Sequence, residues 1–329
     1  MTADRGQREQ AVVPRVPRQV TAVVLTHMRP GLAGDVVRSL VRLEGLPPSR
    51  VVVVVNGDGG LDDHELESQV RTVRLSRNTG PAGGFRAGLV EAFSDPTTEW
   101  AYLCEDDVGL FDLPVPRVAD VVDRVGGLGA SRSVGAVVAY GRTFVGRGAH
   151  TVNVVPPPGA PGEFAPVDVA CWGATLVSRS VVDAGVLPDP EWFFGLEDFD
   201  FFCRVREAGF EVLVDAVAAH RVAGDQTMEG RDQALEVRRP TDQEEAWRSY
   251  YHSRNSFALA RRHGRASWIA WHLAYSVRHL QAAGSREQRG AIVHGLWDGA
   301  VGRMGEHPRY RRRIGEFSPT DSEPGSPAT

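Results

Sequence analysis

Lysine is absent from the 329 residues, so arginine supplies every cationic side chain other than histidine. Arginine is nevertheless outnumbered, with 37 basic against 42 acidic side chains and a formal net charge of -5. A protein that binds nucleic acid through charge normally has a basic excess or a basic face. Nucleic acid is therefore not an expected partner.

Cysteine is scarce as well. Cys104, Cys171 and Cys203 are far apart in apolar surroundings and never occur in a C-x-x-C pair. This spacing argues against a zinc knuckle and against a disulfide framework. A reducing, cytoplasmic environment is the expectation.

Long hydrophobic runs are also missing. The longest aliphatic run is residues 51–55, whereas a helix that crosses a bilayer needs roughly 20 apolar residues. Residues 1–18 are polar, contain prolines and lack the apolar segment of a signal peptide. We expect no membrane-crossing segment, and a loose tail over residues 1–18.

Short β-branched runs alternate with helical stretches from Gln19 onward, which is typical of a mostly parallel sheet covered by helices. The predicted class is α/β. The predicted strands are residues 20–26, 51–55, 71–75 and 100–103, and the predicted helices are 35–43, 80–93 and 197–206.

The end of each early strand is polar. In open α/β sheets, ligands bind beyond the carboxyl ends of the strands. We therefore expect residues 26–29, 56–60, 78–84 and the acidic triplet 105–107 to share one rim of the sheet.

The rest of the chain changes in character. Residues 141–166 are rich in Gly and Pro, which predicts a hairpin or mobile loop rather than packed structure. Beyond Arg239 the pattern is continuously helical and rich in Trp, Tyr and Arg, and the Ser/Pro/Gly-rich end predicts disorder. The predicted divisions are a tail (1–18), an α/β domain (19–240), a helical module (241–315) and a disordered tail (316–329).

Glu105, Asp106 and Asp107 directly follow an apolar strand. Burial and mutual repulsion raise the proton affinity of such a cluster unless a cation neutralises it. Carboxylate oxygens suit Mg²⁺ or Mn²⁺, which commonly bridge one or two carboxylates to substrate phosphates. A solvated acidic turn is the alternative.

Residues 78–84 lack the G-x-G-x-x-G spacing of a dinucleotide-binding helix, so a dehydrogenase loses its main support. Their glycines would let the backbone approach a nucleotide or a sugar. A plain helix-entry turn explains them nearly as well.

Residues 192–200 place three carboxylates among aromatic side chains at the start of a predicted helix. A carboxylate in this position can cap the helix. Alternatively, the aromatic surroundings raise its pKa toward the range of a general base. His220 follows another apolar run, 212–219, and is expected at a strand end.

Taken in this order, the motifs resemble the family 2 glycosyltransferases of the GT-A fold, particularly bacterial rhamnosyl- and galactofuranosyltransferases. The resemblance covers about residues 20–222, with a looser echo in residues 250–255. It implies that the loop after the first strand and the Gly-rich segment hold the nucleotide. The donor-binding residues it implies are Thr26, His27, Arg29, Asn56, Asn78, Gly83, Gly84, Glu105 and Asp106.

The resemblance also implies roles for the remaining motifs. Asp107 would hold the metal on the donor diphosphate, with His220 and Glu105 as further ligands. Asp198 aligns with the general base. Glu197 and Asp200 align with acceptor-positioning acids, and Trp172, Gly173 and Trp192 with the acceptor side.

Two positions depart from the family pattern. The first acid of the usual D-x-D motif is Glu105, whose longer side chain changes how metal or ribose is held. The aspartate that commonly recognises the base after the second strand is replaced by Val55 or Asn56.

The resemblance implies an inverting, Mn²⁺- or Mg²⁺-dependent transfer from a pyrimidine nucleotide-sugar, with rhamnose or galactofuranose favoured. The acceptor would be a glycan or a polyprenyl-linked glycan. A nucleotidyltransferase is an alternative, although residues 26–30 replace its Gly/Arg-rich signature. A catalytically inactive saccharide-binding protein of the same fold is another.

The C-terminal module contains an aromatic stretch, 265–278, flanked by arginines, and a second helical run over 292–301. Aromatic and basic residues together are typical of helices that lie in a membrane interface. Packing on the α/β domain or in a dimer is the alternative. The expected location is cytoplasmic, with peripheral contact at the inner face of the membrane, and the oligomeric state stays open.

Overall fold

The computed structural model describes residues 20–106, 118–128, 132–146, 150–156, 163–223, 245–264 and 266–310. The chain divides into two compact units. The first comprises Met1–Gly146, His150–Pro190 and Glu197–Ala234. The second comprises Arg147–Ala149, Glu191–Leu196 and Leu235–Thr329.

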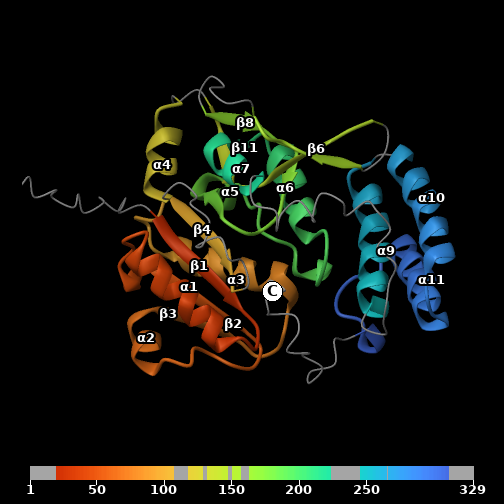
Figure 1. Ribbon diagram of the computed structural model, residues 1–329, viewed down its shortest axis with the longest axis horizontal. Coiled ribbons are helices and arrows are strands. Elements are labelled where there is room, and N and C mark those ends of the chain that lie inside the picture. Colours follow the sequence, from red (N-terminus) through yellow and green to blue (C-terminus); the bar gives the residue numbers. More distant parts are fainter. Residues whose placement is uncertain are drawn as a thin grey trace, which may run out of the picture. The chain divides into compact units, whose positions relative to one another are not determined.

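An eight-stranded sheet forms the centre of the first unit (Figure 1). Its strands are β1 (Val20–Thr26), β2 (Val51–Asn56), β3 (Arg71–Leu75), β4 (Trp100–Glu105), β5 (Val134–Val138), β8 (Phe164–Pro166), β10 (Thr175–Ser178) and β11 (Glu211–Asp215). The strand order is β3-β2-β1-β4-β10-β5-β11-β8. Strands β3, β2, β1 and β4 are mutually parallel, as are β5 and β11, whereas β10 and β8 run antiparallel to their neighbours. The predicted α/β class is confirmed.

Helices cover both faces of this sheet. They are α1 (Pro30–Arg42), α2 (His64–Gln69), α3 (Gly80–Ser94), α4 (Val118–Gly126), α5 (Arg179–Asp183), α6 (Glu197–Glu207) and α7 (Ala216–Ala223). A short 3₁₀ turn, η1 (Pro48–Arg50), leads into β2. Helix α1 begins earlier than its predicted start at Asp35, because Pro30 has its φ angle fixed near the helical value and needs no amide donor at that position.

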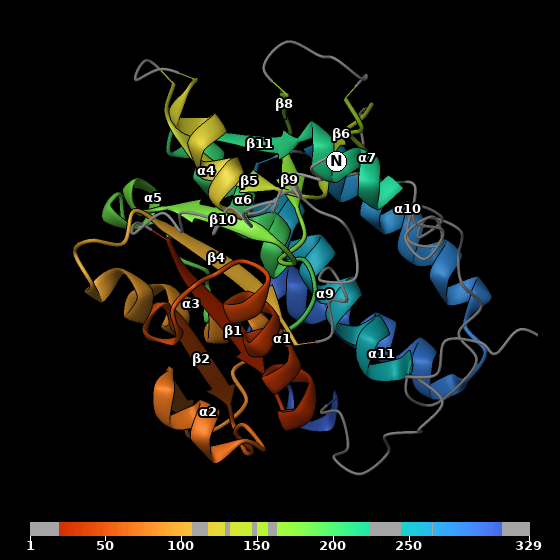
Figure 2. The ribbon, with the colours of Figure 1, turned by 60° about the vertical axis from the view of Figure 1, so that its left-hand side comes forward.

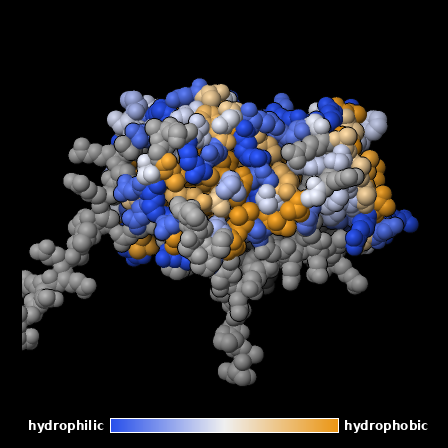
Figure 3. Space-filling view, turned by 90° about the horizontal axis from the view of Figure 1, so that it is seen from above, coloured by the Kyte–Doolittle hydropathy of each residue, from blue (hydrophilic) through white to orange (hydrophobic). Residues whose placement is uncertain are grey.

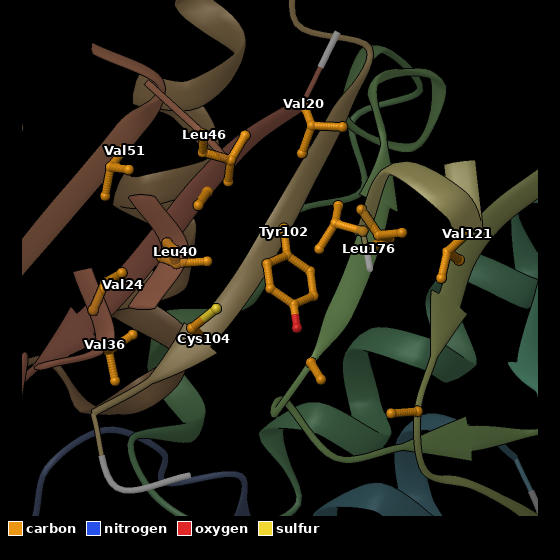
Figure 4. Packing of buried hydrophobic residues seen from close by; sticks show 14 of the residues in the cluster. Val20, Val24, Val36, Leu40, Leu46, Val51, Tyr102, Cys104, Val121 and Leu176 are labelled. Carbon is orange, nitrogen blue, oxygen red and sulfur yellow. The ribbon is translucent and has the colours of Figure 1, made fainter. Parts of the chain in front are cut away.

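The alternation of side chains along β1 separates two apolar clusters. Val20 and Val24 join a cluster that includes residues of α1 and α4 (Figure 4), whereas Val23 and Leu25 join a second cluster with residues of α3 and α6. Successive side chains of a strand point to opposite faces of a sheet. Strand β1 is therefore buried on both faces, between α1 and α3 (Figure 2).

The Gly- and Pro-rich stretch 141–166 contains more structure than the sequence indicates. Strands β6 (Gly141–Phe144) and β7 (Thr151–Asn153) form the predicted hairpin, and β9 (Val169–Ala170) pairs with β6 to complete a three-stranded sheet. The expectation that the stretch is not packed is wrong for β8, which pairs with β11 and buries Phe164.

The expectation that His220 ends a strand is also wrong. Strand β11 stops at Asp215, and the alanine-rich segment that follows is helix α7, which contains His220. Alanine has the highest helix propensity, and the Asp215 carboxylate accepts a hydrogen bond from the Ala218 amide at 3.0 Å, which caps the new helix.

Among the described residues of the second unit, three helices occur in the region predicted to be helical: α9 (Glu245–Arg262), α10 (Ala266–Ala282) and α11 (Arg286–Val301). Ser285 caps α11 by accepting from the Gln288 amide, and Gly302 ends it in a left-handed conformation. Glycines let α11 approach α9 closely, since a Cβ at Gly299 would lie 2.6 Å from the Arg254 carbonyl oxygen.

Two short 3₁₀ turns, η3 (Pro190–Trp192) and η5 (Pro308–Tyr310), also occur. Apolar side chains reach the surface among hydrophilic ones (Figure 3). The large exposed ones on α10 and α11 are Leu273, Val277, Val293, Trp297 and Val301. Within the described part of the chain, no helix has both the length and the apolar character to cross a membrane. Cys104, Cys171 and Cys203 form no disulfide within the part of the chain that the structure describes.

Candidate functional site

Asp106 joins the carboxyl ends of β1 and β4. Its Oδ2 accepts a hydrogen bond from Thr26 Oγ1 at 2.7 Å and a longer one from the His27 amide at 3.4 Å. Its Oδ1 lies 3.4 Å from Arg29 Nη1. Three of the predicted donor-binding residues are therefore held by a fourth, and the prediction of a shared rim is confirmed for residues 26–29 and Asp106.

Asn56, at the end of β2, organises the entry to α3. Its Oδ1 accepts from the amide and the hydroxyl of Thr79, at 2.8 and 2.9 Å. Its Nδ2 donates to the Gly80 carbonyl at 2.9 Å and to Asn78 Oδ1 at 3.2 Å. Asn56 is buried, so its amide shapes this rim from within.

His27 connects the two networks. Its Nδ1 lies 2.7 Å from the Asn56 carbonyl oxygen, and its Nε2 lies 3.3 Å from Asn78 Nδ2. Because a carbonyl only accepts and an amide nitrogen only donates, the ring bears its proton on Nδ1 and accepts at Nε2. The ends of β1 and β2 and the start of α3 thus form one continuous polar surface.

Gly83 and Gly84 have a packing role in α3. A Cβ at Gly83 would collide with the side chain of Thr79, and one at Gly84 would collide with Leu25 of β1. Gly84 lets the helix lie close to β1, and Gly83 leaves room for the Thr79 side chain at the helix entry. The acidic triplet continues this rim at the end of β4, although Asp107 itself lies outside the described residues.

Glu197 and Asp198 form the first turn of α6, where the helix dipole favours negative charge. Burial raises the pKa of Glu197 well above its usual range, and the negative charges of Asp198 and Glu105 raise it further. The charge of Glu105 at the end of β4 therefore acts on the start of α6. The two acidic motifs are thus electrostatically linked within the first unit.

Asp198 is poised near neutrality. Burial raises its pKa to about 7, while the amides of Phe199 and Asp198 itself, the Cys171 thiol and the positive charge of Arg142 limit the increase. The Phe199 amide donates to Asp198 Oδ1 at 2.8 Å. A carboxyl that titrates near pH 7 is suited to accept a proton under physiological conditions.

Asp200, predicted to position an acceptor, is fully buried. Arg204 lies one helical turn later and donates from Nε to Asp200 Oδ2 at 2.9 Å. In the described structure this carboxylate stabilises α6 from within and presents no surface to a ligand.

His220 fits a metal ligand in one respect. Its Nε2 is buried and has no hydrogen-bond partner among the described residues. An unpaired imidazole nitrogen is costly to bury unless a ligand satisfies it. Glu105 is a carboxylate of the type that Mg²⁺ and Mn²⁺ bind. In the described ranges, which omit Asp107, no three His, Cys, Asp or Glu side chains are grouped to hold a cation.

The two tryptophans expected on the acceptor side are both buried. Trp172 packs against Phe85, Phe201 and Phe202, with ring centroids 4.9 to 6.1 Å apart. Gly173 follows it in the half-buried turn between β9 and β10. Trp192 belongs to the second unit, where it is 1% exposed. Both indoles therefore contribute to hydrophobic cores.

The sequence did not indicate Arg142 or Cys171 as members of this site. Arg142 is held on β6 by Thr151, whose Oγ1 accepts from its Nε at 2.7 Å, and by Tyr140. A lone arginine in a Gly/Pro-rich stretch and a lone cysteine after a short strand have no motif to mark them. Only the approach of these segments to α6 reveals their influence on Asp198.

No family model and no curated protein matches the chain. Among solved structures it is similar to GalNAc-T7 with UDP, GalNAc and Mn²⁺, with a TM-score of 0.47 and 14% identity over 79% of this chain and 57% of that one. The chain thus spans little more than half the length of that structure.

It is also similar to the mannosyltransferase PcManGT from Pyrobaculum calidifontis in complex with GDP-Man and Mn²⁺. The TM-score is 0.42, with 16% identity over 86% of this chain and 75% of that one. The A197 protein from STIV gives a TM-score of 0.34, with 15% identity over 60% and 81%. The first two neighbours are GT-A-like glycosyltransferases. At these scores and identities the likeness assigns neither a family nor an activity to this chain.

Proposed function

We propose that this chain is a metal-dependent glycosyltransferase that moves a sugar from a pyrimidine nucleoside-diphosphate sugar to a hydroxyl group of a glycan. The observation that carries the proposal is Asp198, a half-buried carboxyl whose pKa is raised to about 7. It adjoins Glu197, which interacts with Glu105 on the rim that Asp106 and Asn56 organise. A base and a polar rim suited to a donor thus occur in one unit.

The base has a defined part in the reaction. The Asp198 carboxylate takes the proton of the acceptor hydroxyl while the hydroxyl oxygen bonds to the anomeric carbon of the donor. The bond between that carbon and the diphosphate breaks, and its electron pair leaves with the diphosphate. Because the proposal contains one base and no covalent nucleophile, attack comes from the face opposite the leaving group and inverts the anomeric centre.

The donor side is held by fixed backbone and side chains. Asp106 ties Thr26 and Arg29 to the end of β4, and Asn56 ties the start of α3 to the end of β2. These contacts preorganise the rim, so little ordering remains to be done when a nucleotide binds. The rim residues proposed to contact the donor are Thr26, His27, Arg29, Asn78 and Glu105.

The proposed cofactor is Mn²⁺ or Mg²⁺, held by Asp107, His220 and Glu105. When bound, the ion supplies positive charge that stabilises the negative charge of the diphosphate leaving group. The unpaired, buried Nε2 of His220 and the acidic character of Glu105 favour this assignment. Resemblance of the sequence motifs favours rhamnose or galactofuranose as the transferred sugar.

We further propose that the acceptor is a lipid-linked glycan and that the protein contacts the inner face of the cell membrane peripherally. Leu273 and Val277 are exposed one turn apart on α10, and Arg278 is exposed beside them. Apolar and basic side chains on one helix are typical of interfacial binding. Co-sedimentation with anionic vesicles at low salt tests this, with Leu273→Ser/Val277→Ser expected to reduce binding; no binding at low salt contradicts it.

Release of nucleoside diphosphate from a panel of nucleotide-sugars, with and without Mn²⁺, tests the main proposal. We expect release from a pyrimidine donor, increased by an acceptor glycan and lost in Asp198→Asn. Absence of release from every donor with Mn²⁺ present contradicts the proposal.

A further inference from the structure

The second unit contains a pocket of about 520 Å³ that is separate from the residues described above. Tyr250 of α9, Trp297 and Asp298 of α11, and the segment 303–307 line it. Its volume lies within the roughly 300–1,000 Å³ of small-molecule sites.

Hydrogen bonds fix the segment that forms one side of the pocket. The Arg303 amide donates to the Asp298 carbonyl oxygen at 2.8 Å, and the His307 amide donates to the Tyr251 hydroxyl at 2.9 Å. Between them, the Gly305 carbonyl accepts from the buried guanidinium of Arg254. The pocket is therefore preformed, which lowers the entropic cost of binding a ligand.

Ring packing holds two of the pocket's lining side chains, Tyr250 and His307. The ring of Tyr250 lies parallel to that of Tyr310, with centroids 4.3 Å apart and an interplanar angle of 17°. The imidazole of His307 lies 4.9 Å from each of these rings. His307 Nδ1 accepts from the Arg309 amide, so in the neutral ring the proton is on Nε2, which can donate.

The pocket presents a buried carboxylate. Asp298 is 6% exposed, accepts from the Tyr250 hydroxyl at 2.7 Å and lies 3.7 Å from Arg303 Nη1. A carboxylate has about four acceptor sites, so it can accept further hydrogen bonds while these two partners hold it in place. The guanidinium of Arg303 is 73% exposed and offers donors beside it.

Trp297 adds an exposed aromatic surface to the pocket. It is 61% exposed, which is unusual for so large an apolar side chain. The C–H face of a sugar ring can cover such an indole, while its hydroxyls take the donors and acceptors around it. An apolar ligand would cover the remaining donors of Arg303 and acceptor sites of Asp298 without offering them hydrogen bonds. The mixed charges of Arg303, Asp298 and Glu306 favour neither an anion nor a cation.

We propose that this pocket binds a neutral saccharide, with Trp297 as the stacking surface and Asp298 as the principal acceptor for sugar hydroxyls. The ligand class rests on the proposed function, because a glycan acceptor is a chain of such residues.

Titration of the full chain with neutral hexose oligomers of two to six residues, followed by calorimetry and tryptophan fluorescence, tests the proposal without a donor. We expect saturable binding at about millimolar concentration or below, and a Kd about tenfold higher in Trp297→Ala, or about 1.4 kcal/mol. Tyr250→Phe, which removes the hydroxyl that orients Asp298, should weaken binding by a smaller factor. Val293→Ala is the matched control, since Val293 is exposed on α11 and outside the pocket.

The inference is overturned if none of the oligomers shows saturable binding, or if UDP binds in their place. It is also overturned if Trp297→Ala and Val293→Ala have equal Kd values. Melting curves of the variants establish that they remain folded. Saccharide binding without turnover of any nucleotide-sugar supports the pocket and contradicts the proposed function. Turnover of a nucleotide-sugar without saturable binding of any oligomer supports the proposed function and contradicts the pocket.

Discussion

The side-chain amide of Asn255 donates a hydrogen bond to the carbonyl oxygen of Gly195 at 2.6 Å. The same nitrogen lies 2.8 and 3.1 Å from the carbonyl oxygens of Phe194 and Trp192. The segment it holds is strained, because Phe193 and Leu196 have φ angles of +59° and +63°. Residues other than glycine adopt positive φ angles of this size only when their surroundings impose them.

We therefore expect Asn255→Ala to lower the unfolding free energy of the second unit by about 1–3 kcal/mol, since the carbonyls of residues 192–195 lose a buried donor. Denaturant unfolding measures the change, and Gln281→Ala on the exposed surface of α10 is the control. Equal midpoints for the two variants would show that the segment keeps its conformation without Asn255.

The raised pKa of Asp198 predicts that turnover depends on pH. Its pKa is raised to about 7, and only the deprotonated carboxylate can accept a proton. Turnover should therefore rise with pH through about 7 and be lost as the pH falls below it. We expect Asp198→Asn to lower kcat by roughly 10²- to 10⁴-fold with donor affinity unchanged. A flat profile between pH 5 and 9, or near-normal turnover of the variant, would move the base role to Glu197.

The sequence was sufficient to predict the arrangement of the first strands. Runs such as 51–55 are too short and too β-branched for helices, and parallel strands place their carboxyl ends at one rim. The grouping of Thr26, Asn56 and Asp106 follows from that rule. The same rule gave a wrong prediction for residues 212–219, because short apolar runs are compatible with either a strand or a buried helix. The alanines and the Asp215 cap favour a helix in the second half of this run.

Burial was the property that the sequence could not supply. Asp200 and Asp198 are two positions apart and carry the same group, yet Arg204 covers one and the other remains half-buried. Trp192 was expected on the acceptor side, but its neighbours in space come from α9, about 60 positions later. Such contacts are set by tertiary packing, which local pattern does not encode.

The proposed metal site predicts that excess chelator abolishes transfer and that added Mn²⁺ restores it. Asp107→Ala should weaken donor binding, measured by calorimetry in the presence of Mn²⁺, because the ion bridges carboxylates to donor phosphates. His220→Ala should raise the Mn²⁺ concentration needed for half-maximal activity, since it removes an unpaired buried nitrogen. Full activity in excess chelator contradicts the metal assignment, and Asp183→Ala, outside this rim, serves as the control.

The second unit should lose stability on acidification because His252 and His272 become protonated. Burial lowers the pKa of each to about 4, and each is further lowered by a neighbouring imidazole, that of His279 for the first and of His252 for the second. Between pH 6.5 and 4 the unfolded chain binds protons that the folded chain does not. The stabilisation is therefore present above pH 6.5 and is lost as the pH falls toward the folded pKa.

Each of these histidines can contribute roughly 3 kcal/mol over that interval. His272 offers the sharper test, because neither of its buried ring nitrogens has a hydrogen-bond partner among the described residues. Phenylalanine has nearly the same shape and needs no partner, so His272→Phe should raise the unfolding free energy at pH 5 and flatten its dependence on pH. Urea unfolding of the second unit within the full chain, at pH 5 and pH 7.5, measures both effects. His64→Gln is the control, since the His64 side chain is 96% exposed. Parallel pH profiles for His272→Phe and His64→Gln would mean that His272 is already protonated in the folded state at pH 5.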